Sequence, residues 1–173
     1  DAIAVVNTRT LELVKTLPAG SDPEAFAVHP NGHIYLSNED ANKASVLDPV
    51  SGEILAEIPV GIEPEGVGIT PDGKLVMVTS ESTNMVHVIT VPEHKLIASI
   101  LVGSRPREVA FTADGRWAYV SGEIGGQVSK LDVSTNTLVR TVKLPIAEAK
   151  PMGVEVSRDQ TSLYVSTGRA DVV

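Results

Sequence analysis

Residues 63–81 read EPEGVGITPDGKLVMVTSE, and their pattern recurs along the chain. A proline and a short glycine-rich β run lead into a Pro-Asp-Gly turn, where proline presets φ and glycine accepts a positive φ. Residues 75–79 then form a second run of β-branched and aliphatic side chains. The stretch therefore predicts two antiparallel strands joined by a tight turn.

Four copies of this pattern follow one another. The anchoring prolines are separated by 41, 42 and 45 residues, and they are Pro23, Pro64, Pro106 and Pro151. Two further β-rich runs, such as residues 85–89 and 96–100, complete a copy, and no window shows the apolar period of a helix. Four short antiparallel strands in ~40–45 residues are typical of one propeller blade. We therefore predict an all-β fold, a β-propeller built from four-stranded antiparallel blades.

The repeat also predicts how the chain is divided. We expect one propeller region over residues 1–173 with about four blade-equivalents: half blades at 1–20 and 148–173, and whole blades at 21–61, 62–103 and 104–147. The half blades can pair to close a small ring, or the chain is an arc of a larger ring whose open edges must be covered or will self-associate. Because it begins at Asp1 without a recognisable signal peptide, we expect a piece of a longer chain.

Composition excludes several classes of function. The 173 residues include 14 Lys and Arg against 22 Asp and Glu, for a net charge of −8, which argues against binding nucleic acid or anionic lipid. No run approaches the ~18 apolar residues of a membrane-spanning helix. The absence of cysteine removes disulfides, thiolate metal sites and cysteine nucleophiles, and it suits an oxidising compartment.

Short segments carry a family signature. Four of them are YLSNE (35–39), SVLD (45–48), EIPVG (57–61) and YVS (119–121). They resemble the YVTN-type β-propeller repeat. Its relatives also include archaeal surface proteins, so a surface-layer or adhesion module is one alternative function.

A narrower resemblance rests on longer segments. These are AEIPVGIEPEG (56–66), TSESTNM (79–85), SRPR (104–107) followed by FTADG (111–115), and SGEIGG (121–126). They resemble β-propeller proteins associated with pyrroloquinoline-quinone (PQQ)-dependent catabolism in bacteria. The resemblance implies an exported, periplasmic protein of about seven blades. The chain departs from it by holding four blade-equivalents and by having Gln160 where the last turn would have glycine.

Strand direction predicts where a site would lie. Strands alternate in direction, so the loop before the first strand and the loop after the second lie on one face, around the channel mouth. We expect a ligand or partner there, held by Glu24, Glu39, Glu65, Glu81, Arg105, Arg107, Glu123, Lys150 and Met152. Two neighbouring blades offer acids and the next two offer bases, so this mouth can take a polar ligand, a cation or a partner loop. The alternative is that these charges pair with one another between blades or lie in solvent.

Metal and enzyme signatures are weak. Glu39, Glu81 and Glu123 belong to blades that fan apart, and we expect them to hydrogen-bond the backbone of a neighbouring loop rather than a metal. The four histidines fall at unlike positions of the repeat, so no shared ligand sphere is expected. No nucleophile elbow, phosphate-binding loop or zinc-protease motif occurs.

These observations lead to one function and two alternatives. We predict a non-catalytic binding or scaffold propeller of the bacterial cell envelope, without a cofactor, linked to a quinoprotein oxidation pathway and binding a protein or small polar ligand. A lactone-hydrolysing propeller enzyme and the surface module are the alternatives.

Overall fold

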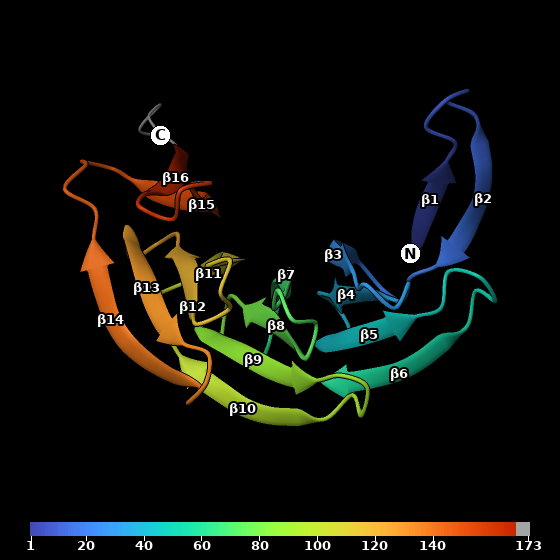
Figure 1. Ribbon diagram of the computed structural model, residues 1–173, viewed down its shortest axis with the longest axis horizontal. Helices are drawn as coiled ribbons and strands as arrows, with labels where there is room; N and C mark the ends of the chain where they lie inside the picture. The colour runs from blue at the N-terminus through green and yellow to red at the C-terminus, as the bar shows by residue number, and fades with distance from the viewer. Residues whose placement is uncertain (169–173) are drawn as a thin grey trace.

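The computed structural model describes residues 1–168 as five antiparallel sheets arranged side by side in an arc (Figure 1). Three sheets have four strands in sequence order. They are β3 (Pro23–Val28), β4 (Ile34–Asn38), β5 (Lys43–Leu47) and β6 (Ile54–Pro59); β7 (Pro64–Ile69), β8 (Leu75–Ser80), β9 (Met85–Thr90) and β10 (Leu96–Leu101); and β11 (Pro106–Phe111), β12 (Trp117–Gly122), β13 (Gln127–Asp132) and β14 (Thr137–Lys143).

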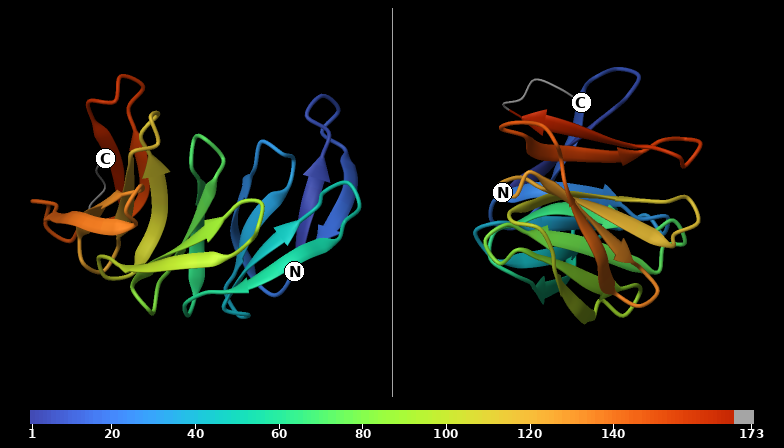
Figure 2. Two further views of the ribbon diagram at one scale, coloured as in Figure 1. Left: turned by 60° about the horizontal axis from the view of Figure 1, so that its bottom comes forward. Right: turned by 90° about the vertical axis from the view of Figure 1, so that its left-hand side faces the viewer.

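A two-stranded sheet stands at each end of the arc. One is β1 (Ala2–Val6) with β2 (Leu13–Pro18), and the other is β15 (Lys150–Val156) with β16 (Leu163–Gly168). The innermost strands β3, β7, β11 and β15 contact one another in turn along the concave side. The hairpins β3–β4, β7–β8 and β11–β12 stand in a row along the arc (Figure 2). The predicted all-β architecture of propeller blades is confirmed.

The core lies between the sheets. Val46 and Ile58 of one sheet pack on Val76 and Val78 of the next, and an equivalent aliphatic cluster joins the sheets β7–β10 and β11–β14. Successive side chains of a strand point to opposite faces of its sheet, so each sheet packs against the neighbouring sheets on both sides. Among residues 1–168, no helix is long and apolar enough to span a bilayer.

The turns explain why the Pro-Asp-Gly signal recurs. Asp72 accepts hydrogen bonds from the Thr70 hydroxyl (2.8 Å) and the Lys74 amide (3.1 Å), while Gly73 has a φ of +71°. Gln160 adopts a φ of +63° where the other turns use glycine. Its side chain accepts a hydrogen bond from the Ala113 amide of the neighbouring turn (2.8 Å), so the replacement adds a contact between sheets.

Candidate functional site

Hydroxyl groups on the second strand of each four-stranded sheet fix the backbone of the inner strands. Thr79 Oγ1 accepts a hydrogen bond from the Gly66 amide in its own sheet and donates one to the Arg107 carbonyl in the next sheet, both at 2.8 Å. Ser37 makes the same bridge to the Glu65 carbonyl, and Ser121 bridges to the Met152 carbonyl. These three hydroxyl bridges link the inner strands pairwise.

The close approach of β7 and β11 leaves no room for a side chain at Gly66. A Cβ atom added there would lie 2.1 Å from the Arg107 carbonyl oxygen. These bridges were not predicted, although each copy of the repeat has a Ser or Thr at the same position.

Five of the predicted residues form one ionic cluster, which we call the mouth network: Glu65, Glu81, Arg105, Arg107 and Glu123. Arg107 Nη1 lies 2.8 Å from Glu65 Oε1, contacts Glu81 Oε1 and lies 3.8 Å from Glu123 Oε2. Arg105 Nε lies 2.6 Å from Glu81 Oε2 and 3.4 Å from Glu123 Oε2. The charges therefore pair between blades, which was the alternative considered for this face.

Burial distinguishes the members of the mouth network. The Glu81 side chain is 2% exposed and lies between both arginines. Burial raises the pKa of Glu65 above its ordinary value, the positive charge of Arg107 opposes this shift, and the negative charges of Glu24 and Glu39 add to it. Three carboxylates face two guanidinium groups, so the network keeps an acidic excess.

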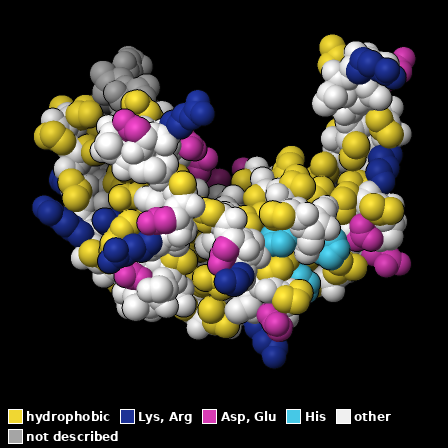
Figure 3. All heavy atoms as spheres, viewed as in Figure 1, with side chains coloured by type: hydrophobic (Ala, Val, Ile, Leu, Met, Phe, Trp, Pro, Cys, Tyr) yellow, Lys and Arg dark blue, Asp and Glu magenta, His cyan; other side chains and the backbone are white. Residues whose placement is uncertain are grey.

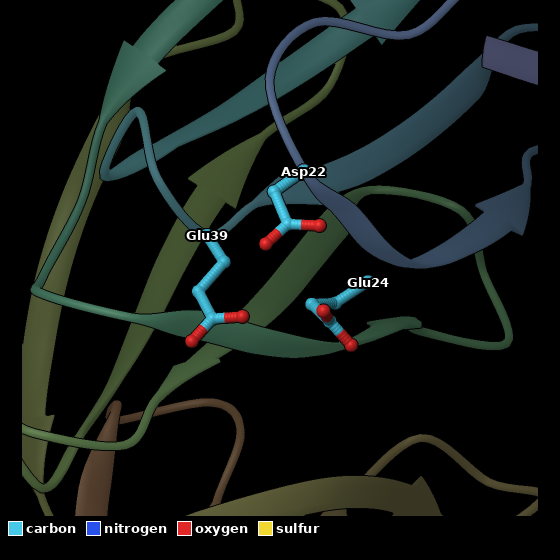
Figure 4. A group of neighbouring side chains, drawn as sticks. All are labelled: Asp22, Glu24 and Glu39. Carbon is cyan, nitrogen blue, oxygen red and sulfur yellow. The ribbon is translucent and has the colours of Figure 1, made fainter. Parts of the chain in front are cut away.

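A second acidic group lies beside the network and contains two more predicted residues. Carboxylate oxygens of Asp22, Glu24 and Glu39 lie within 4.8 Å of one another and face one another in Figure 4. The pKa of Glu39 is raised, first by burial, then by a hydrogen bond with Glu24 and by the charges of Glu24, Asp22 and Glu63. Among the described residues, this is the group whose ligand atoms are close enough to share a cation.

Lys150 and Met152 lie apart from the mouth network. Lys150 lines a smaller pocket of about 180 Å³ together with Ile124, Lys143 and Glu148. Met152 is placed by its hydroxyl bridge, but its side chain adds no charge.

The glutamates after the second strands contact the neighbouring loop differently from the prediction. The main-chain amides of Glu39, Glu81 and Glu123, and not their carboxylates, donate to the carbonyls of Asp22, Glu63 and Arg105. The side chains remain available for the mouth network and for the acidic group.

The residues before the prolines are held in an uncommon conformation. Asp22, Glu63 and Arg105 have φ values of +49°, +55° and +57°, in the left-handed region that non-glycine residues rarely adopt. Asn42 Oδ1 accepts the Glu63 amide (3.1 Å), and Asn84 Oδ1 accepts the Arg105 amide (2.8 Å). Glu63 and Arg105 line a pocket of about 410 Å³ together with Glu81, Ser82, Asn84, Ser104 and Ile124. We call this the interblade pocket.

The histidines lie away from the mouth network. The rings of His29 and His94 each lie 5.8 Å from the ring of Tyr35, and histidines gather on one part of the visible face (Figure 3). Sequence position did not reveal this proximity, because turns at unlike positions of adjacent blades meet there. His87 is separate and buried, and its Nε2 accepts the Gly61 amide at 2.9 Å.

Comparison with protein families gives two overlapping matches. The model described as "YNCE-like beta-propeller" matches residues 1–114, and the model described as "Lactonase, 7-bladed beta-propeller" matches residues 63–173. No curated protein sequence matches the chain.

Solved structures share the fold. Hydrazine synthase of Kuenenia stuttgartiensis is 26% identical with a TM-score of 0.89, and the similarity covers 96% of this chain and 49% of that one. The dihydro-heme d1 dehydrogenase NirN is 22% identical with a TM-score of 0.70, covering 97% and 35%. A virginiamycin B lyase from Staphylococcus aureus with quinupristin is 17% identical with a TM-score of 0.80, covering 96% and 56%. The chain thus spans about half or less of the length of these proteins.

Proposed function

Because the chain belongs to the YNCE-like and the seven-bladed lactonase β-propeller families, we propose that it is the ligand-binding part of a propeller that holds a small charged ligand or a partner loop at its channel mouth. The role is non-catalytic binding, with the mouth network and the adjoining acidic group as the contact surface. Fold alone does not assign this function, so the proposal rests on the site.

One observation carries the proposal: charged side chains from successive blades meet at the mouth on a fixed backbone. The hydroxyl bridges hold the inner strands, and Arg107 contacts the carboxylates of Glu65 in strand β7 and of Glu81 and Glu123 in the loops after β8 and β12. In the acidic group beside this network, neither Glu24 nor Glu39 forms an ion pair with a Lys or Arg among residues 1–168. Such a surface attracts a ligand that carries a positive group.

Thermal unfolding with a panel of small charged compounds tests the proposal. We expect at least one compound to raise the melting temperature of the wild-type protein, because a ligand that binds only the folded state stabilises it. The shift should disappear in Glu65→Gln and Arg107→Met but persist in Lys74→Met, which changes an exposed pair in the turn between β7 and β8. Equal shifts in all variants, or no shift with any compound, would contradict the proposal.

We place this binding protein in the bacterial cell envelope, in the setting of PQQ-dependent oxidation and without a cofactor of its own. The segments at 56–66, 79–85 and 121–126 support this setting through their resemblance. Fractionation of cells that express the full reading frame should find the protein in the periplasm. Recovery from the cytoplasm alone would contradict the placement.

A lactone-hydrolysing activity is the second candidate, favoured by the lactonase family match across the mouth network. Glu65 is the carboxylate suited to act as a base toward water, because burial raises its pKa. Acid release from γ-butyrolactone and δ-valerolactone, followed at constant pH, separates the two functions. Hydrolysis that is lost in Glu65→Gln would favour the enzyme, and the absence of hydrolysis would leave the binding role.

A further inference from the structure

We propose that the interblade pocket binds a small zwitterion of the α-amino-acid type that carries an apolar side chain. The inference rests on the proposed function, since it names a ligand class for the same face of the molecule. Its basis is that Glu63 and Arg105 line the same pocket, occupy equivalent positions in consecutive blades and carry opposite charges.

The two charges line one pocket without neutralising each other. Among the ion pairs of residues 1–168, none joins Glu63 to Arg105, although both line the interblade pocket. A ligand that carries an ammonium and a carboxylate can therefore bridge them, with the ammonium at Glu63 and the carboxylate at Arg105. Arg105 already pairs with Glu81 and Glu123, but its terminal nitrogens keep donors for a carboxylate, whereas Glu63 has no ion-pair partner among residues 1–168. An amine alone would leave those donors unused, and a carboxylate alone would leave Glu63 without a positive partner.

Both groups are fixed before a ligand arrives. The Arg105 amide donates to Asn84, its carbonyl accepts from the Glu123 amide (2.9 Å), and its Nε is held by Glu81. The hydrogen bond that the Arg105 side chain makes within the described residues uses Nε, so the terminal guanidinium nitrogens keep donors for a carboxylate. This arrangement reduces the ordering cost of binding.

Glu63 is held in the same manner. Its amide donates to Asn42, its carbonyl accepts from the Glu81 amide (2.8 Å), and its Oε2 accepts from the Ser82 hydroxyl. Its other carboxylate oxygen remains for an ammonium group. Equivalent backbone hydrogen bonds thus hold Glu63 and Arg105 as an acidic and a basic lining residue of the interblade pocket.

The remaining lining selects size and polarity. The volume of about 410 Å³ falls in the range of roughly 300–1,000 Å³ that small-molecule sites occupy. Ser104 and the amide of Asn84 add polar contacts, and Ile124 is an apolar side chain that is 58% exposed at the wall. An aliphatic ligand side chain that covers Ile124 removes apolar surface from water.

Calorimetric titration with leucine, 4-methylpentanoate and 3-methylbutylamine tests the charge requirement. Leucine should bind, and each singly charged analogue should bind about ten- to a hundredfold more weakly, because one charge-assisted contact is lost. Equal affinities for the three compounds, or no binding of leucine, would overturn the inference.

Variants locate the effect in the interblade pocket. Glu63→Gln keeps the acceptor for Ser82 but should weaken leucine binding about tenfold or more and leave 4-methylpentanoate unchanged. Ile124→Ser should reduce the preference for leucine over glycine, whereas Glu93→Gln, in an exposed turn, is the matched control with unchanged affinity. Unchanged leucine binding in Glu63→Gln would place any amino-acid binding elsewhere.

The outcome also separates this inference from the proposed function. If another compound of the thermal panel binds through Arg107 and leucine does not, the zwitterion inference fails alone. If no compound binds, both fail.

Discussion

Replacing Arg107 with methionine tests how the channel mouth is stabilised. Methionine is a suitable replacement because Met152 occupies the equivalent position of the next inner strand, where its carbonyl makes the same hydroxyl bridge. The change removes a positive charge from Glu65, Glu81 and Glu123 at once. Breaking a buried ion pair by removing one partner costs about 3–5 kcal/mol, because the other charge stays buried.

The structure sets the expected magnitude within that range. Glu81 is 2% exposed, but its contact with Arg105, whose Nε lies 2.6 Å from Glu81 Oε2, does not involve Arg107 and should persist in the variant. We therefore expect Arg107→Met to lower the free energy of unfolding by about 3 kcal/mol, the lower end of the range. Urea unfolding followed by the fluorescence of Trp117, the single tryptophan, measures the change.

Two comparisons decide whether this reasoning holds. Lys74→Met removes a partner of Asp72 in a pair whose side chains are 78% and 54% exposed, and it should cost at most about 1 kcal/mol. Adding Glu81→Gln to Arg107→Met removes the buried carboxylate charge that Arg107 no longer balances. The double variant should therefore regain part of the lost free energy of unfolding. A loss below about 1 kcal/mol for Arg107→Met, or a double variant less stable than the sum of the single changes, would refute the argument.

Three further predictions concern the supports of the site. Gly66→Ala should destabilise the protein by about 1–3 kcal/mol, because its Cβ would lie 2.1 Å from the Arg107 carbonyl oxygen, and equal unfolding midpoints would contradict this. Thr79→Val removes a hydroxyl bridge and should cost about 1–3 kcal/mol by urea unfolding, since a buried carbonyl loses its donor. Burial lowers the pKa of His87, so below the ordinary histidine pKa the unfolded chain binds a proton at this residue more readily than the folded chain does. Stability should therefore fall as the pH drops below the ordinary histidine pKa of about 6.5. His87→Ser should reduce this pH dependence, and an unchanged dependence would exclude His87 as its source.

The sequence predicts the fold well because each copy of the repeat recurs with the same conformational requirements. Each copy contains a turn that only a few residues can make and strands whose alternation requires a neighbour on both faces. The position of Glu65 and Arg107 at a common mouth follows from strand direction alone. Of the nine residues predicted for the mouth, five meet in the mouth network, whereas Lys150 and Met152 lie apart from it.

Side-chain partners could not be predicted in the same way. Glu39, Glu81 and Glu123 occupy equivalent positions in the sequence repeat. Of the three, only Glu81 lies between two arginines that belong to the following blade. This difference depends on how the two neighbouring sheets pack against each other. The sharing of Tyr35 by His29 and His94 has the same origin. Local pattern specifies elements, whereas ionic and aromatic partners are specified by how neighbouring sheets meet.

The hydroxyl bridges act on main-chain carbonyls, so the bridges themselves place no requirement on the side chains of the bridged residues. Glutamate, arginine and methionine already occupy the three bridged positions, at Glu65, Arg107 and Met152. Recognition chemistry can therefore change by single substitutions at these places while the spacing of the inner strands is conserved. In evolution, and in engineering, the rim of this channel can diversify its specificity without first having to find a new architecture.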